Sequence, residues 1–210
     1  MGFEDVALSR ELGEREPPPV PRADAAADED VRLIAAVARR DRRSFERLYT
    51  KYAHRVFRFA FRLSRDQSKS EEVVNDVMLE IWKSAAEFGG RSAPSTWIFG
   101  IARHRTLNAL RGRTLYIGDS DEAAEVADPA PSPEERVDGG RIRERLQAAL
   151  ERLSTEQREV IELAFVEGLN YRQIAAIAKC PENTVKTRMF HARKKLEPLL
   201  TRLLGEGDQS

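Results

Sequence analysis

The segment from Ser154 to Glu197 constrains the fold of this chain more than any other part, because its turn residues and apolar spacing define consecutive short helices. Ser154 and Gln157 have the spacing of an N-terminal capping box. Residues 171–178 predict a further helix, and Lys-Cys-Pro predicts the turn that ends it. The last helix carries an apolar stripe at i, i+4, i+7 and i+11, formed by Val185, Met189, Ala192 and Leu196. This pattern predicts a helix-turn-helix.

The last helix is also strongly basic. No acidic residue lies between positions 183 and 195, and five residues there are positively charged: Lys186, Arg188, Arg193, Lys194 and Lys195. A helix of this kind can fill a major groove and bind phosphates at the same time. We therefore expect the C-terminal part of the chain to bind DNA.

Composition excludes several classes of protein. The sequence has no run of eighteen apolar residues and no charged-then-apolar start, so we expect neither membrane insertion nor a secretory signal, and a cytoplasmic location. Cys180 is the single cysteine, and the three histidines are far apart, so we expect no metal and no cofactor. No Gly-rich phosphate loop, local nucleophile signature or carboxylate cluster suggests an enzyme, and we expect no small-molecule substrate.

Charge is segregated along the chain although the formal net charge is zero. Residues 31–65 contain eleven basic and two acidic side chains, whereas residues 66–88 contain six acidic and two basic ones. Residues 91–113 then have five arginines and no acid. The alternation indicates that polyanion contact and protein contact belong to different surfaces. The alternative, that each run is only a solvated helix face, stays open.

The expected fold class is all-α, with two small helical domains joined by a flexible acidic linker. Residues 1–29 are acidic and proline-containing, which predicts a disordered N-terminal arm. Residues 30–113 follow the helical period and predict the first domain, a helical bundle. Residues 114–140 are acidic and contain three prolines, which predicts the linker. Residues 141–204 predict the helix-turn-helix domain.

Three parts of the chain resemble bacterial sigma factors of the extracytoplasmic-function group of the sigma-70 family. They are EEVVNDVMLEIW at 71–82, STWIFGIARHRTLNALR at 95–111, and REVIELAFVEGLNYRQIA at 158–175 with TVKTR at 184–188. The resemblance implies a sigma-two-like domain and a sigma-four-like domain. Such a protein brings RNA polymerase core to promoters in a stress or envelope response, recognises the minus-ten and minus-thirty-five elements, and promotes DNA melting.

The resemblance also implies partners and a polymerase-binding face. The helix at 71–82 corresponds to the segment that docks on the clamp of the largest polymerase subunit; the flap and an anti-sigma factor are further expected partners. Glu72, Asp76 and Glu80 lie at i, i+4 and i+8, where like charges repel unless a basic partner or solvent relieves them. A plain solvated face is the alternative. We expect Trp82 to belong to the core because it shares a stripe with apolar residues.

Minus-ten recognition is assigned by resemblance to the loop at 88–95 and to the helix after it. The loop would capture a flipped base, and Gly89 and Gly90 permit close approach of the backbone. Its candidate contacts are Phe88, Arg91 and Ser92; the alternative is a helix stop with Arg91 in solvent. The helix would contact the upstream part of the element through Arg103, His104, Arg105, Asn108 and Arg111. The family often has Asn in place of His104 and Asp in place of Asn108, so the preferred bases stay open.

Minus-thirty-five recognition is assigned to the last helix. Lys186, Thr187, Phe190 and His191 match the family positions that face bases. Phosphate contacts are expected from the helix start at Asn183 and Thr184, and from Arg188, Arg193, Lys194 and Lys195. Lys179 stands where the family commonly has glycine, and a left-handed Lys there costs roughly 1 kcal/mol. We expect Cys180 to be a buried turn residue.

A second class of function fits part of the same pattern. In a stand-alone helix-turn-helix regulator, the first domain would sense a ligand or partner and only the second would bind DNA. Such a regulator binds its operator alone, whereas a sigma factor needs core polymerase for sequence-specific binding. A further hypothesis is that the acidic linker segment 119–138 pairs with the basic helices and acts as a brake on DNA binding.

Overall fold

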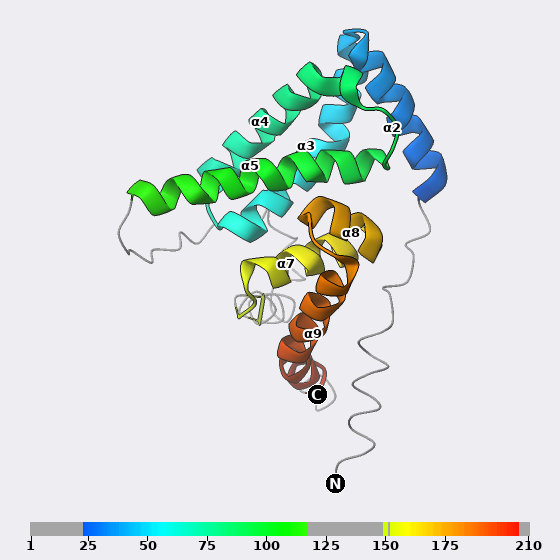
Figure 1. Cartoon of the computed structure of the whole chain (residues 1–210). Helices are drawn as coiled ribbons and strands as arrows, with labels where there is room; N and C mark the ends of the chain where they lie inside the picture. The colour runs from blue at the N-terminus through cyan, green and yellow to red at the C-terminus, as the bar shows by residue number, and fades with distance from the viewer. Residues whose placement is uncertain (1–22, 117–148, 151, 206–210) are drawn as a thin grey trace, which may run out of the picture.

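The computed structural model of the chain describes residues 23–116, 149–150 and 152–205. All regular structure within these ranges is helical, which confirms the all-α class. Figure 1 shows an N-terminal body, in blue to green, above a C-terminal body, in yellow to red. The N-terminal body comprises α2 (Ala23–Ala38), α3 (Arg42–Ser64), α4 (Gln67–Ser84), the 3-10 turn η1 (Ala85–Glu87) and α5 (Pro94–Tyr116). The C-terminal body comprises α7 (Thr155–Ile161), the π-helical η3 (Glu162–Val166), α8 (Tyr171–Ala178) and α9 (Glu182–Gly205).

The N-terminal body begins earlier than the sequence predicted. Helix α2 starts at Ala23, so residues 23–29 are helical and do not belong to an irregular arm. Alanine has the highest helix propensity, and the first turns of α2 are alanine-rich. The buried Asp30 then ties α2 to α3, because its carboxylate accepts a hydrogen bond from the Tyr52 hydroxyl at 2.5 Å. The rest of the predicted arm, residues 1–22, lies outside the described residues.

Local capping explains how α3 and α4 follow one another with so short a connection. The Asp41 carboxylate accepts from the backbone amides of Arg43 and Ser44 and so starts α3. Arg65 ends it in the left-handed conformation, with φ at 56°. Asp66 immediately caps α4 by accepting from the Lys69 amide at 3.0 Å. The two helices therefore pack as neighbours, and α5 crosses them through contacts such as Phe59 against Phe99, with ring centroids 5.6 Å apart.

The C-terminal body confirms the predicted helix-turn-helix. Ser154 and Gln157 form the expected capping box, and α8 spans the predicted residues 171–178. Lys179 ends α8 in the left-handed conformation at φ 52°, as its place in the turn predicted. The predicted apolar stripe of α9 is buried: Val185, Met189, Ala192 and Leu196. Helix α9 begins at Glu182, one residue before the expected start.

The two bodies pack directly against each other. Helix α8 lies against α5, and α7 contacts α3 (Figure 1). One continuous cluster of buried apolar side chains joins Phe59 and Ile98 of the N-terminal body to Leu163 and Ile174 of the C-terminal body. Helix α5 extends to Tyr116, three residues past the predicted domain end at 113. The expected linker from residue 117 onward, and the expected start of the second domain at 141, lie outside the described residues.

Candidate polymerase and DNA interfaces

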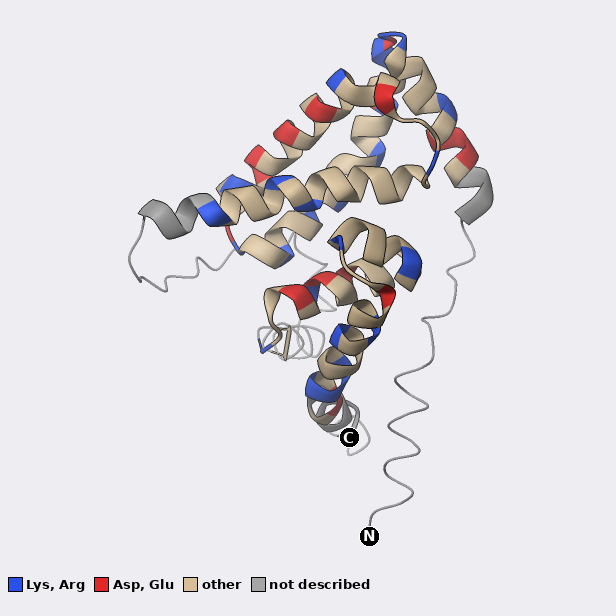
Figure 2. Cartoon of the chain, viewed as in Figure 1, with Lys and Arg blue, Asp and Glu red and all other residues tan. Residues whose placement is uncertain are grey.

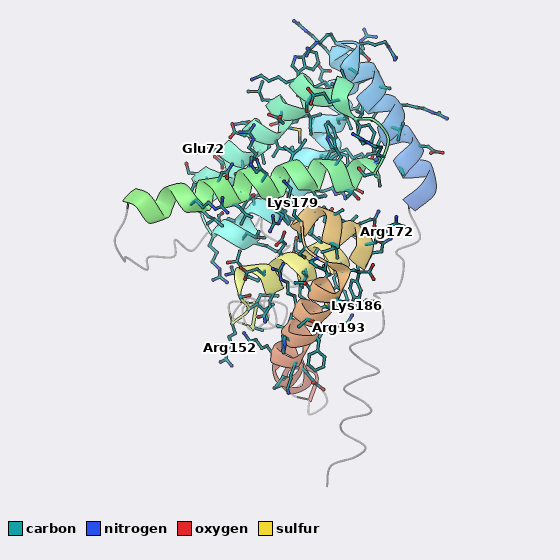
Figure 3. The ribbon with its side chains drawn as sticks, in the orientation of Figure 1. Glu72, Arg152, Arg172, Lys179, Lys186 and Arg193 are labelled. Carbon is teal, nitrogen blue, oxygen red and sulfur yellow. The ribbon has the colours of Figure 1, made fainter. Side chains whose placement is uncertain are left out.

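An acidic face runs along the outer side of α4, and Figure 2 shows it as a row of red segments. Glu72 and Asp76 are exposed, and Figure 3 places Glu72 on the outside of this helix. Leu79 is 49% exposed in the next turn, so the face combines carboxylates with one large apolar side chain. Sequence reasoning missed Leu79, although the helical period places it beside Asp76. The face can bind a basic partner through its carboxylates and make an apolar contact at Leu79.

Glu80, the third predicted residue of this face, is engaged within the chain. Its Oε2 accepts a hydrogen bond from Arg105 Nη2 at 2.7 Å, and both side chains are about one-third exposed. A predicted polymerase contact is thus paired with a predicted DNA contact across α4 and α5. A substitution at either position therefore removes this ion pair.

The turn between η1 and α5 presents polar side chains to solvent. Arg91 and Ser92 are exposed, as a base-contacting loop requires. Gly90 has φ at 65°, where a side chain would be strained, and this explains one of the two glycines. Phe88 is half-buried instead, because its ring packs against Trp97 with centroids 5.1 Å apart. Phe88 therefore packs beside Trp97 and is less exposed to solvent than Arg91 and Ser92.

Trp82 is only partly buried. Its ring is half-buried against Phe45, with centroids 5.2 Å apart, and the Arg40 guanidinium lies 5.5 Å from the ring centroid. Arg40 also donates to the Trp82 carbonyl oxygen at 2.8 Å. The predicted core role is therefore only partly met.

The predicted DNA residues of α5 divide into two groups. His104, Asn108 and Arg111 are exposed, and Asn108 Nδ2 lies 3.3 Å from His104 Nε2. Arg105 pairs with Glu80, and Arg103 pairs with Glu159 of the C-terminal body. The structure therefore leaves one side of α5 open and covers the Arg103 side with α7.

Helix α9 presents its predicted DNA residues opposite its buried stripe. The exposed residues are Asn183, Lys186, Thr187, His191, Lys194 and Lys195, and Figure 3 places Lys186 and Arg193 along this helix. The four remaining predicted contacts on α9 are half-buried: Thr184, Arg188, Phe190 and Arg193.

Several side chains of α9 also have contacts within the C-terminal body. The Arg193 guanidinium lies 5.6 Å from the centroid of the Phe165 ring, which is itself half exposed. Lys186 forms an i,i+4 ion pair with Glu182 at 3.3 Å. An exposed pair of this kind is worth little, so Lys186 can exchange it for a phosphate.

Cys180 differs from its expectation. Its side chain is half-buried, and Arg188 Nη1 lies 3.9 Å from its sulfur. The side chain packs against the core cluster of the two bodies without being fully buried.

Sequence reasoning missed three buried carboxylates where the two bodies meet. The side chains of Glu159, Glu162 and Glu167 are 1–3% exposed. Burial raises the pKa of Glu162 to about 7, against the opposing effect of Arg62. Burial also raises the pKa of Glu159 and of Glu167. No sequence signal marked these residues, because a buried glutamate and a solvated one have the same helical spacing.

Family comparisons agree with the geometry of the two bodies. A model of sigma-70 region 2 matches residues 48–115, and a model of sigma-70 region 4 matches residues 143–196. The chain is 30% identical to the RNA polymerase sigma-H factor of Pseudomonas aeruginosa over 85% of this chain and 97% of that protein. It is 33% identical to the ECF RNA polymerase sigma factor RpoE of Cereibacter sphaeroides over 79% of this chain and 92% of that protein. The chain therefore belongs to the sigma-70 family and, within it, to the extracytoplasmic-function group of RNA polymerase sigma factors.

Two solved structures are also similar. The sigma factor RpoE of Bartonella quintana, in complex with the anti-sigma factor NepR, has a TM-score of 0.62 and 30% identity over 75% of this chain and 96% of that one. CnrH in complex with the cytosolic domain of CnrY has a TM-score of 0.60, covering 83% of this chain and 98% of that one; at 23% identity this likeness concerns the fold alone. In the described part of the chain, no helix has the length and apolar character needed to span a membrane.

Proposed function

We propose that the two bodies of this sigma factor divide promoter recognition between them. The N-terminal body binds polymerase core through α4 and the minus-ten element through the 88–93 turn and α5. The C-terminal body binds the minus-thirty-five element through α9. The protein acts in the cytoplasm and catalyses no reaction itself; it positions core polymerase and promotes melting by holding unpaired bases.

The observation that carries this proposal is the separation of charge in the structure. Figure 2 shows the acidic residues of α4 apart from the basic residues of α9. The exposed polar groups of α5 are likewise separate from the acidic face of α4, which carries Glu72, Asp76 and the exposed Leu79. A regulator that binds only DNA needs the last of these surfaces and not the first. The acidic face suits the clamp of the largest polymerase subunit, because a docking helix with carboxylates requires a basic partner.

An anti-sigma factor is a proposed further partner. The Bartonella quintana relative, 30% identical to this chain, is bound to one. The same proposal predicts a role in a regulated stress or envelope response, in which release of the inhibitor makes the sigma factor available to core polymerase.

Run-off transcription with purified core polymerase tests the proposal. Core alone and the sigma factor alone should give no specific transcript on a genomic promoter library, and the combination should give defined start sites. A gel shift separates this from a stand-alone regulator, because the regulator would bind one sequence tightly without core. Specific binding by the isolated chain together with no transcript from the reconstituted enzyme would refute the proposal.

A further inference from the structure

Four arginines of the N-terminal body face the C-terminal body. Arg55, Arg58 and Arg62 lie at i, i+3 and i+7 and so share one side of α3, and Arg103 comes from α5. Seven helical residues rise about 10.5 Å, the length of DNA helix axis over which one strand carries about three phosphates. The four guanidinium groups therefore form a basic face of a size that suits a short stretch of nucleic-acid backbone. We call these four residues the arginine face.

Carboxylates of the C-terminal body occupy this face. Arg55 Nε donates to Glu167 Oε2 at 2.8 Å, and Arg62 Nε lies 3.0 Å from Glu162 Oε2. Arg103 pairs with Glu159. Arg58 Nη2 is 4.0 Å from Glu167 Oε1, at the limit of an ion pair.

Hydrogen bonding between the arginine face and the three glutamates is incomplete. Arg58 Nε, Glu162 Oε1 and Glu167 Oε1 are buried and have no hydrogen-bond partner in the described part of the chain. Unpaired buried polar atoms of this kind cost free energy, so the packing of the two bodies is not optimised at this surface.

The arginine face and the three glutamates that cover it differ in solvent exposure. The arginine side chains remain 18–42% exposed, whereas the three carboxylates are 1–3% exposed. Separation of the bodies would therefore expose the whole row of guanidinium groups. Guanidinium binds carboxylate and phosphate oxygens with the same planar fork of donors. The chemistry that holds the glutamates is thus the chemistry that would hold a phosphate backbone.

We propose that Arg55, Arg58, Arg62 and Arg103 form a phosphate-binding face for promoter DNA, and that Glu159, Glu162 and Glu167 occupy this face in the free chain. The proposal rests on the proposed function and deepens it, because it adds α3 to the DNA-binding surface. Arg103 joins the face to α5, where its neighbour His104 belongs to the exposed minus-ten candidates. DNA and the C-terminal carboxylates exclude each other at this surface. In the described structure, the acidic side chains that cover the basic helices are Glu159, Glu162 and Glu167. The acidic linker segment 119–138, which the sequence suggested for this role, lies outside the described residues.

The first test uses the reconstituted polymerase holoenzyme with Arg58→Ala and Arg62→Ala, made separately. Removing one arginine that binds a phosphate should lower the slope of log affinity against log salt by about 0.9. Arg62→Lys should keep the slope, because it keeps the charge. Arg39→Ala is the matched control, since Arg39 is exposed in the same body and lies outside the arginine face. Unchanged slopes for both face variants would show that these arginines only hold the two bodies together, and would overturn the proposal.

Pull-down of core polymerase by the same variants tests the proposed function separately, because the acidic face of α4 is unaltered in them. Retained core binding with unchanged salt slopes refutes the arginine face alone. Failure of the unmodified chain to bind core refutes the proposed function instead.

The second test follows hydrogen exchange in the free, unmodified chain when a minus-ten fork DNA is added at low salt. The DNA concentration is about 100 µM, which is at or above the typical non-specific dissociation constants of 10⁻⁶–10⁻⁴ M. Fluorescence anisotropy reports binding of the DNA. Amides of α7 and η3 should lose protection when the DNA binds, because their carboxylates leave the face. Bound DNA with unchanged protection would contradict the proposal.

Discussion

Replacement of Glu162 by glutamine should make the folded chain more stable at neutral and alkaline pH. Glu162 lies 3.0 Å from Arg62, yet burial raises its pKa from 4.5 to about 7. The ion pair does not compensate for burial, because Glu162 Oε1 has no described partner and the Glu167 carboxylate raises the pKa further. Arg58 also faces the group and lowers its pKa, though with less effect than Arg62.

The magnitude follows from proton linkage. The folded state binds the Glu162 proton more tightly than the unfolded state, so its stability falls as pH rises from about 4.5 to about 7. A shift of this size corresponds to a loss of about 3 kcal/mol in the free energy of unfolding. This loss is complete above about pH 7 and absent below about pH 4.5. Glutamine is neutral at every pH and nearly the same size. The variant should therefore approach the stability of the unmodified chain below about pH 4.5 and exceed it by up to about 3 kcal/mol at pH 8.

Urea unfolding followed by circular dichroism at pH 5, 6, 7 and 8 measures this difference. The variant retains some pH dependence, because burial also raises the pKa of Glu159 and Glu167. The quantity to compare is the gap between the two proteins, which should widen with pH. A gap that stays constant, or a variant that is less stable at pH 8, would show that pairing with Arg62 outweighs burial and would refute the reasoning.

Four other variants test the candidate surfaces and the core. Reversal of charge in the double variant Glu72→Lys, Asp76→Lys should weaken pull-down of core polymerase at least about tenfold, about 1.4 kcal/mol, with little change in Tm, because both side chains are exposed. His191→Ala should cost about 1–3 kcal/mol of discrimination at one minus-thirty-five position in promoter-binding assays, with little change in salt slope, if it contacts a base. Met189→Ala should lower the free energy of unfolding by about 2–5 kcal/mol because the side chain is fully buried, whereas Lys194→Ala should change it by no more than about 0.5 kcal/mol.

Each of these tests has a specific contrary result. Glu46→Lys on α3 is the control for the polymerase-binding variant, since it reverses an exposed charge outside the acidic face. Equal loss of core binding in this control would mean that net charge, not the α4 face, determines the interaction. A lower salt slope in His191→Ala would make His191 a backbone contact. Normal stability of Met189→Ala would contradict its place in the core.

The helix-turn-helix was predictable because its determinants are local. Capping by Ser154 and Gln157, the left-handed Lys179 and the buried stripe of α9 each depend on residues within a few positions of one another. The exposed face of α4 followed from the same periodicity. The start of α2 at Ala23 was missed because low apolar content and nearby prolines favoured an irregular arm, whereas the alanines and Asp30 favoured the helix.

The chain's amino-acid order thus determined the helices, the turn chemistry and which side of each helix is apolar, since these depend on spacing and intrinsic preference. Tertiary structure alone decided that Arg103 is covered and that Glu159, Glu162 and Glu167 are buried. Arg55 and Glu167 are 112 positions apart, and Arg103 and Glu159 are 56 apart. Periodicity places a side chain relative to its own helix axis. Only the packing of one body on the other determines whether that side meets water or an opposite charge.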